Sequence, residues 1–80
     1  MRTQEAVVCR IRELIEEKEI TVSKLSIISA VPPSTLKNII NGNSKNTGIV
    51  TIAKLCDGLG ISLQEFIADP VFSGLDQEIE

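Results

Sequence analysis

The first part of the chain carries a helical pattern of apolar and polar positions. Residues 4–18 contain neither Gly nor Pro, and Thr3 is a suitable N-cap before them. The apolar positions of this stretch recur at helical spacing and comprise Val7, Ile11, Leu14 and Ile15. The acidic residues lie mostly on the other side, and Cys9 lies away from the apolar stripe. The pattern therefore predicts an amphipathic helix over residues 4–18.

A second, shorter pattern begins at Thr21, which is a good N-cap residue. Its apolar or small positions at helical spacing are Val22, Leu25, Ile28 and Ser29. The pattern predicts a short helix that ends near Ala30.

The stretch SAVPPSTLKNIING, residues 29–42, then places two prolines between helical patterns. A residue that precedes a proline is disfavoured in the α conformation, so the chain is expected to turn here. Pro33 suits the first position of a following helix, where its missing N–H costs nothing, although Pro32 offers no capping side chain. We expect that helix to extend to about Asn41 and to stop at Gly42, which readily adopts the left-handed conformation.

The remaining pattern predicts a polar loop at residues 43–48 and two further helices. The apolar side of the first helix comprises Ile49, Ile52, Ala53, Cys56 and Leu59. Gly58 and Gly60 mark its end, residues 62–65 form a capping-box sequence that opens the next helix, and Pro70 closes it. The apolar side of this last helix comprises Leu63, Phe66 and Ile67. Because no strand pattern occurs, we predict an all-α fold of five short helices.

Length and composition indicate how many domains the chain forms and what its core consists of. Eighty residues suffice for one small domain, which we place at residues 1–70, with a short tail at residues 71–80. Phe66 and Phe72 are the only aromatic residues, so the core must be built from Ile, Leu and Val. No apolar run reaches the roughly 18 residues of a membrane span, and no signal peptide opens the sequence. We therefore expect a cytoplasmic protein without membrane contact.

Residues suited to catalysis or metal binding are scarce. The chain has two cysteines and no His, which excludes a Ser-His or Cys-His pair and a zinc site of Cys and His. We expect Cys56 to be a small core residue and Cys9 a free thiol. No Gly-rich phosphate loop occurs. These observations predict a protein that is not an enzyme and needs no cofactor or metal.

The distribution of charge is more informative than its sum. The net charge of −3 argues against nucleic-acid binding, for which a basic balance is usual. From residue 20 to residue 56, however, the chain contains no Asp or Glu. The basic residues of this span are Lys24, Lys37, Lys45 and Lys54. A surface that is locally free of carboxylates can approach phosphates even in an acidic protein.

The run TVSKLSIISAVPPSTLKNIING, residues 21–42, resembles the helix-turn-helix of the Cro and phage-repressor type found in Xre-like regulators. The run LCDGLGISLQEF, residues 55–66, resembles the junction between the fourth and fifth helices of that family. The resemblance covers roughly residues 5–69. It implies a compact, lambda-repressor-like DNA-binding domain with its helix-turn-helix in the second and third helices.

The chain departs from the family pattern at several positions. Val22 stands where the family often has a DNA-contacting Gln, Ser26 where it often has Ala, and Ala30 where it often has Gly. Many members link the first helix to the end of the third by a buried Arg–Glu pair, and here Ile15 and Ile40 stand at those positions. Apolar residues can replace a buried ion pair without loss of stability, so this departure does not argue against the fold.

The predicted helix over residues 33–41 has a polar face suited to base contacts. On a helical wheel its buried side comprises Leu36, Ile39 and Ile40, and its polar side comprises Ser34, Lys37, Asn38 and Asn41. The resemblance implies base contacts at the start and middle of this helix, where the matching residues are Pro33, Ser34, Lys37 and Asn38. In the major groove, Asn38 suits adenine, Lys37 suits guanine, and Pro33 can contact a thymine methyl group.

Phosphate contacts are expected around this helix. The candidates are Thr21, Lys24, Asn41, Asn43, Lys45, Asn46 and Thr47. Near Thr47 and Gly48 the start of the next helix is expected to add free N–H groups and the positive end of a helix dipole. The alternative interpretation is an ordinary solvated surface on which these side chains have no partner.

A single helix-turn-helix reads only a few base pairs, so a homodimer is predicted. We expect its contact to include Phe66, Ile67 and Phe72. The alternative is that Phe72 folds back on its own core and residues 73–80 fray.

We predict sequence-specific binding of a double-stranded DNA operator, and the resemblance implies a bacterial or phage-type transcriptional regulator, which we expect to be a repressor. The alternative is an interaction module of the same fold that binds a protein partner, such as an antitoxin or an antirepressor. The acidic net charge, Val22 and the exposed position predicted for Ile27 favour that alternative.

Overall fold

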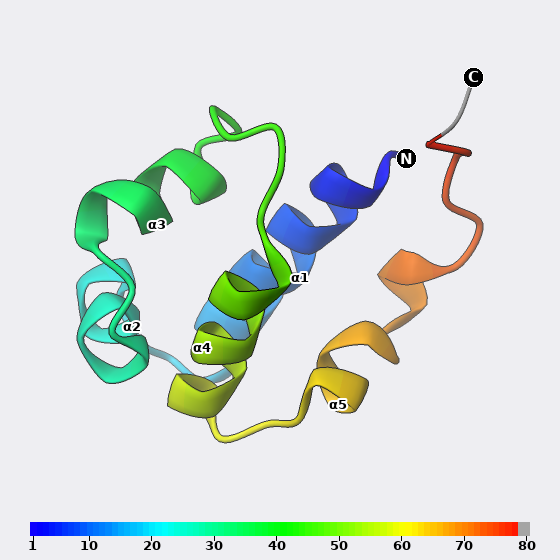
Figure 1. The fold of residues 1–80 in the computed structure, drawn as a ribbon. Coiled ribbons are helices and arrows are strands. Elements are labelled where there is room, and N and C mark those ends of the chain that lie inside the picture. Colours follow the sequence, from blue (N-terminus) through cyan, green and yellow to red (C-terminus); the bar gives the residue numbers. More distant parts are fainter. Residues whose placement is uncertain (79–80) are drawn as a thin grey trace.

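The computed structural model of the protein describes residues 1–78, in which five α-helices and one short 3₁₀ helix form and no β-strand occurs (Figure 1). The elements are α1 (Thr3–Glu17), α2 (Val22–Ser29), α3 (Pro33–Ile40), α4 (Ile49–Leu59), α5 (Leu63–Ile67) and η1 (Pro70–Phe72). The predicted all-α fold is confirmed, and all five predicted helices are present.

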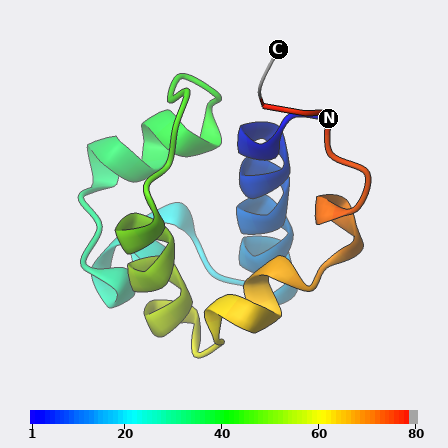
Figure 2. The same cartoon turned by 45° about the vertical axis from the view of Figure 1, so that its right-hand side comes forward.

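α1 lies between two groups of elements. In Figure 2, α2, α3 and α4 lie to the left of α1 and η1 lies to its right, whereas in Figure 1 α4 passes in front of α1. α2 packs against α3 and α4, α1 contacts α3 and η1, and α5 packs against α4. The start of α1 and the last described residues lie side by side, so that the two ends of the described chain meet at one end of the molecule.

The core is aliphatic, as the composition requires, with Phe66 as its one fully buried aromatic side chain among the described residues. Its buried members are Val7, Ile11, Leu14, Leu25, Val31, Leu36, Ile39, Ile52, Leu55, Cys56, Leu59 and Phe66. Cys56 is buried and Cys9 is an exposed free thiol, as predicted. Burial raises the pKa of the Cys56 thiol, which favours its neutral form in the core.

Three apolar positions differ from the expected faces. Ile49, predicted to be in the core, is 59% exposed, and Ile28 is also exposed, whereas Leu55 is fully buried. The buried face of α4 begins only at Ile52, because the first turn of that helix extends beyond the core. Periodicity places a residue on a face, but it does not tell how far the neighbouring helices extend along that face.

Gly60 is the left-handed C-cap of α4 and Gly58 is the last residue but one of that helix, so the two glycines mark its end as predicted. Gly58 also has a packing role. A Cβ atom at this position would lie 2.9 Å from the backbone N and Cα of Ser29 in α2. Glycine is therefore required for the close approach of α2 and α4, and the small residue Ser29, itself buried, occupies the facing position.

We expect Gly58→Ala to destabilise the protein by about 1–3 kcal/mol, because the added methyl group meets backbone atoms that cannot move aside independently. This loss outweighs the helix propensity of Ala, which favours Ala over Gly by about 1 kcal/mol. Urea denaturation of the variant and of the unchanged protein measures the effect. An unchanged or raised free energy of unfolding would contradict the packing argument.

α2 is capped at its start and leads into the turn before α3 through one unusual backbone position, Ala30. The Thr21 hydroxyl oxygen accepts a hydrogen bond from the Lys24 N–H at 3.0 Å, which confirms the predicted N-cap. Ala30 ends α2 in the left-handed conformation, with φ of +57°, which costs a residue with a side chain about 1 kcal/mol or more. The buried Ser26 hydroxyl donates to the Val31 carbonyl oxygen at 2.6 Å and so stabilises the turn from within.

Arg10 connects α1 to the C-terminal part of the domain. Its guanidinium donates to the carbonyl oxygens of Phe66 at 2.9 Å and Glu65 at 3.1 Å, and it pairs with Asp69 at 3.2 Å and with Glu13. The backbone N–H two residues after Asp69 lowers the pKa of that carboxyl, whereas the neighbouring Asp69 carboxyl raises the pKa of Glu13. α1 and α5 are thus held together by polar contacts as well as by the core.

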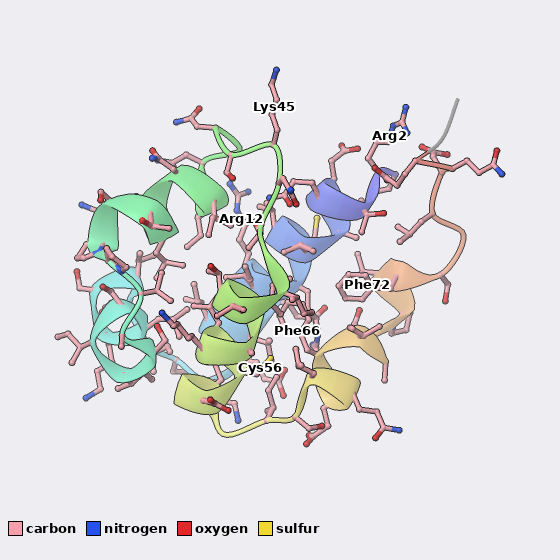
Figure 3. The ribbon with its side chains drawn as sticks, viewed as in Figure 1. Arg2, Arg12, Lys45, Cys56, Phe66 and Phe72 are labelled. Atoms are coloured by element: carbon pink, nitrogen blue, oxygen red, sulfur yellow. The ribbon has the colours of Figure 1, made fainter. Side chains whose placement is uncertain are left out.

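The segment after α5 folds back onto the domain. Phe72 is half-buried, packs against the core and lies 5.8 Å from Phe66 between ring centroids (Figure 3). Of the two predicted alternatives for this side chain, the structure has the contact with its own core. The predicted domain boundary at residue 70 stays a prediction, since η1 and α5 share this contact.

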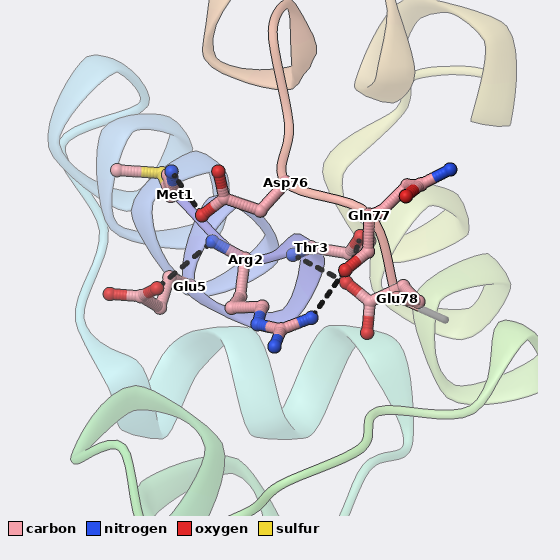
Figure 4. Close-up of polar contacts among 7 residues, drawn as sticks. All are labelled: Met1, Arg2, Thr3, Glu5, Asp76, Gln77 and Glu78. Carbon is pink, nitrogen blue, oxygen red and sulfur yellow. Dashed lines mark hydrogen bonds and ion pairs between the residues drawn. The ribbon is translucent and has the colours of Figure 1, made fainter. Parts of the chain in front are cut away.

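The end of the described chain lies against the start of α1 (Figure 4). The Asp76 N–H donates to the Met1 carbonyl oxygen at 3.0 Å, and the Arg2 guanidinium donates to the Gln77 carbonyl oxygen. Residues 73–78 are therefore not frayed as the second alternative expected. Residues 79–80 lie outside the described part of the chain.

The predicted N-cap at Thr3 is wrong, because α1 begins at Thr3 and Arg2 is its N-cap. The Thr3 hydroxyl donates to the Glu78 carboxylate at 2.9 Å, and the Thr3 N–H points to the same carboxylate at 3.3 Å (Figure 4). These hydrogen bonds lower the pKa of Glu78. A carboxylate from the far end of the chain thus occupies the position that a local cap would take.

Candidate nucleic-acid interface

α3 presents all four predicted base-contact residues to solvent. They are Pro33, Ser34, Lys37 and Asn38, and each is exposed. On the other side of the helix, Leu36 and Ile39 are buried and Ile40 is half-buried. The predicted buried and polar sides of this helix are therefore confirmed, while the contacts with bases stay a prediction.

The N-terminus of α3 is open. Pro33 is the first helical residue, as predicted, and Pro32 is an N-cap without a capping side-chain hydrogen bond. The first internal helical bond is donated by the Leu36 N–H to the Pro32 carbonyl oxygen. The preceding N–H groups, of Ser34 and Thr35, belong to the first turn, where a helix offers donors to water or to an anion.

The loop after α3 folds back onto that helix. Gly42 has φ of +78°, as predicted for the residue that stops α3. The N–H groups of Asn43 and Ser44 both donate to the Asn38 carbonyl oxygen, at 2.9 Å and 3.2 Å. The loop is thereby tied to the middle of α3, next to a predicted base-contact residue.

A polar hollow of about 340 Å³ lies between α3, this loop and the start of α4. Its lining consists of Thr35, Asn38, Ile39, Asn43, Ser44, Asn46, Thr47, Gly48 and Thr51. Four of the predicted DNA-contact residues thus share one hollow. None of the lining residues is acidic, in keeping with the acid-free span of the sequence.

The other predicted phosphate contacts lie around this surface. Asn41 and Lys45 are exposed in the loop, and the Lys45 side chain projects away from the domain (Figure 3). Thr21 and Lys24 are exposed at the start of α2, separate from the hollow, and the Thr21 hydroxyl oxygen already accepts the capping hydrogen bond. The contacts of these residues with phosphate stay a prediction.

Thr47 differs from the expectation, because its N–H is not free. This N–H donates to Gln4 Oε1 at 2.9 Å, and Gln4 Nε2 donates to Thr47 Oγ1 at 2.7 Å. The predicted free N–H at the start of α4 is therefore wrong for Thr47. Sequence reasoning missed Gln4, since it lies in the first turn of α1 and no local pattern connects it to a loop 43 residues away.

Acidic groups lie beside the loop as well as along the solvent side of α1. A second hollow, of about 490 Å³, is lined by Lys45 and Thr47 from the loop and by Glu78 from the tail. The lowered pKa of Glu78 keeps this carboxylate ionised near neutral pH. The second hollow is thus lined by a positive side chain from the loop and a negative side chain from the tail.

The predicted dimer residues are not equally available. Phe66 is 1% exposed and cannot contact a partner in this conformation, so its assignment to a dimer contact is wrong. Phe72 covers it and is half-buried, whereas Ile67 is 51% exposed. Helical spacing placed Phe66 and Ile67 on one apolar side of the helix. In the structure, however, Phe66 is buried in the core whereas Ile67 is exposed.

The departure at Ile15 and Ile40 is compensated in another way. Both side chains are half-buried against the core, as expected of residues that replace an ion pair. In addition, the Arg12 guanidinium of α1 donates to the Ile40 carbonyl oxygen at the end of α3. α1 and the end of α3 are thus still linked by an Arg, which binds a helix C-terminus in place of a carboxylate.

Over residues 1–78, no helix is both long enough and apolar enough to cross a membrane. The same part of the chain contains no group of three or more His, Cys, Asp or Glu residues placed to hold a metal ion.

Comparison with known proteins identifies the family. Residues 10–70 match the Cro/C1-type HTH DNA-binding domain. The prophage Lp1 protein 11, whose crystal structure is known, is 32% identical to this chain and superimposes with a TM-score of 0.79 over 94% of this chain and 100% of its own. No curated protein matches the chain. The family match covers most of the chain and includes the whole helix-turn-helix, so the protein belongs to the Cro/C1-type helix-turn-helix DNA-binding domain family.

Proposed function

We propose that the protein is a sequence-specific, double-stranded DNA-binding transcriptional regulator that acts as a repressor in the cytoplasm. In this proposal α3 enters the major groove, where Ser34, Lys37 and Asn38 contact base edges, and the loop at residues 41–47 contacts phosphates. The observation that carries the proposal is the polar face of α3, whose four predicted base-contact residues are all exposed. Membership of a DNA-binding family supports it.

The proposal includes a homodimer, because two recognition helices about 34 Å apart can read two half-sites on one face of DNA. Ile67 offers an exposed apolar side chain on α5 for such a contact, and Phe72 lies on the same part of the fold. Dimers can form on the DNA even where the free protein is a monomer, so binding and self-association need separate measurements.

Selection of bound duplexes from a random DNA pool tests the proposal. We expect a two-fold symmetric motif whose half-sites are about 10 base pairs apart. Because few cations face the DNA, we expect each protomer to neutralise about 3–5 phosphates and the log–log salt slope of a dimer to be no steeper than about −10. If no duplex is retained even at low salt, the protein does not act as a DNA-binding regulator.

The second candidate function is a protein-interaction module of the same fold, such as an antirepressor or an antitoxin. The observation in its favour is the apolar surface of α2, where Ile27 is 76% exposed and Ile28 is also exposed. The acidic isoelectric point of about 4.9 is in keeping with it. The selection experiment separates the two functions, since a module without DNA contact enriches no motif.

A further inference from the structure

The hydrogen bonds between Gln4 and Thr47 determine the direction of one proton. A backbone N–H can only donate, so the Gln4 atom that receives the Thr47 N–H must be the carbonyl oxygen of the amide. The other end of the same amide is then the NH₂ group, which lies 2.7 Å from Thr47 Oγ1. An amide NH₂ has no acceptor capacity, and the Thr47 hydroxyl oxygen must therefore accept from it.

A hydroxyl that accepts from Gln4 cannot also donate to it. The proton of the Thr47 hydroxyl thus points away from the amide, and no acceptor for it is found among the described residues. Thr47 lines the polar hollow with Asn38, Asn43 and Asn46, and it also lines the second hollow with Gln4. The residue thus belongs to the loop at which the proposed function places DNA phosphates. A hydroxyl in this state is a donor ready for an anionic oxygen.

We infer that Gln4 is a positioning residue for DNA binding, which holds the loop before α4 in place and aims the Thr47 hydroxyl proton at a phosphate oxygen of the DNA backbone. This inference rests on the proposed function and adds to it a residue of α1, outside the helix-turn-helix. Gln4 acts through Thr47 and does not itself contact the DNA.

Replacement of Gln4 by Glu reverses the hydrogen bond without changing the shape of the side chain. A carboxylate still accepts the Thr47 N–H, but it has no proton to donate, so the Thr47 hydroxyl turns and donates to Glu. The donor for phosphate is then lost. Gln77→Glu is the matched control, because it makes the same chemical change at an exposed tail residue near the same end of the molecule (Figure 4). The Gln77 side chain makes no hydrogen bond with the described loop residues.

The experiment measures the affinity of the full chain for a random-sequence duplex at low salt, since phosphate contacts do not depend on sequence. We expect Gln4→Glu to weaken binding by about tenfold more than Gln77→Glu, and Thr47→Val to weaken it by about tenfold. Thr47→Ser keeps the hydroxyl and is expected to bind within about twofold of the unchanged protein. When Thr47 is already Val, we expect Gln4→Glu to lower the affinity for the duplex no more than Gln77→Glu does.

Two results would overturn the inference. One is an equal loss for Gln4→Glu and Gln77→Glu, which would assign the effect to net charge alone. The other would be that Gln4→Glu still lowers the affinity by about tenfold more than Gln77→Glu when Thr47 is already Val. In both cases the unchanged protein still binds DNA, whereas failure of the proposed function itself would appear as no binding by the unchanged protein. Thermal unfolding of each variant confirms that the fold is retained.

Discussion

Lys37→Glu is expected to lower the affinity for selected operator DNA by about 100-fold or more while the fold is retained. Lys37 is exposed near the middle of α3 and is the only cation of that helix. Its replacement removes one base contact, worth about 1–3 kcal/mol, and places a carboxylate against the phosphates of the groove. Electrophoretic mobility shift or fluorescence anisotropy with the selected duplex gives the affinity.

Lys54→Glu is the matched control for this variant. It makes the same change of charge on an exposed residue of α4, within the same acid-free span but outside the proposed contact residues. We expect a much smaller loss, which reflects only the long-range field and diminishes as salt is raised. Equal losses for Lys37→Glu and Lys54→Glu would mean that the net charge of the domain, and not α3, determines binding.

Phe66→Ala is expected to cost about 3–5 kcal/mol of the free energy of unfolding, a large part of the stability of so small a domain. Phe66 is fully buried, its ring lies 5.8 Å from that of Phe72, and the Arg10 guanidinium lies 5.9 Å from its centroid. Removal of the ring opens a cavity and takes away the surface on which η1 rests. Urea denaturation followed by circular dichroism measures the loss.

The neighbouring residue provides the comparison. Ile67 is half-exposed, so Ile67→Ala should change the free energy of unfolding by less than about 1 kcal/mol. The same variant tests the proposed dimer contact, because sedimentation would show a weaker dimer without a loss of stability. If Ile67→Ala destabilised the domain as much as Phe66→Ala, the assignment of Phe66 to the core and of Ile67 to the surface would be wrong.

Local signals in the sequence were reliable where the physical cause is local. Thr21 and Ser62 cap α2 and α5 through hydrogen bonds to N–H groups three residues on, and such bonds need only the correct residue at the correct spacing. Pro33 begins α3 and Gly42 ends it, because each has the backbone preference that its position requires. The face of α3 that carries the candidate DNA contacts followed from helical spacing alone.

What periodicity could not provide is the extent and the partners of each face. Ile49 and Ile67 belong to apolar sides by spacing, yet both are exposed, since burial depends on where neighbouring helices end. Gly58 was predicted only as a helix-end residue, whereas its packing role depends on Ser29 of α2, which approaches it closely, a contact that neither segment indicates by itself.

The sequence by itself determined the helices, their order, the turn and the polar face of α3, because hydrogen bonds and backbone preferences within a few residues specify all of these. The tertiary structure alone decided which distant residues hold the tail and the loop before α4 against α1. Thr3 meets Glu78, and Gln4 meets Thr47, across 75 and 43 residues of sequence. Such polar contacts leave no periodic trace in the chain, and only the packing of α1 against the loop and the tail brings their atoms within hydrogen-bonding distance.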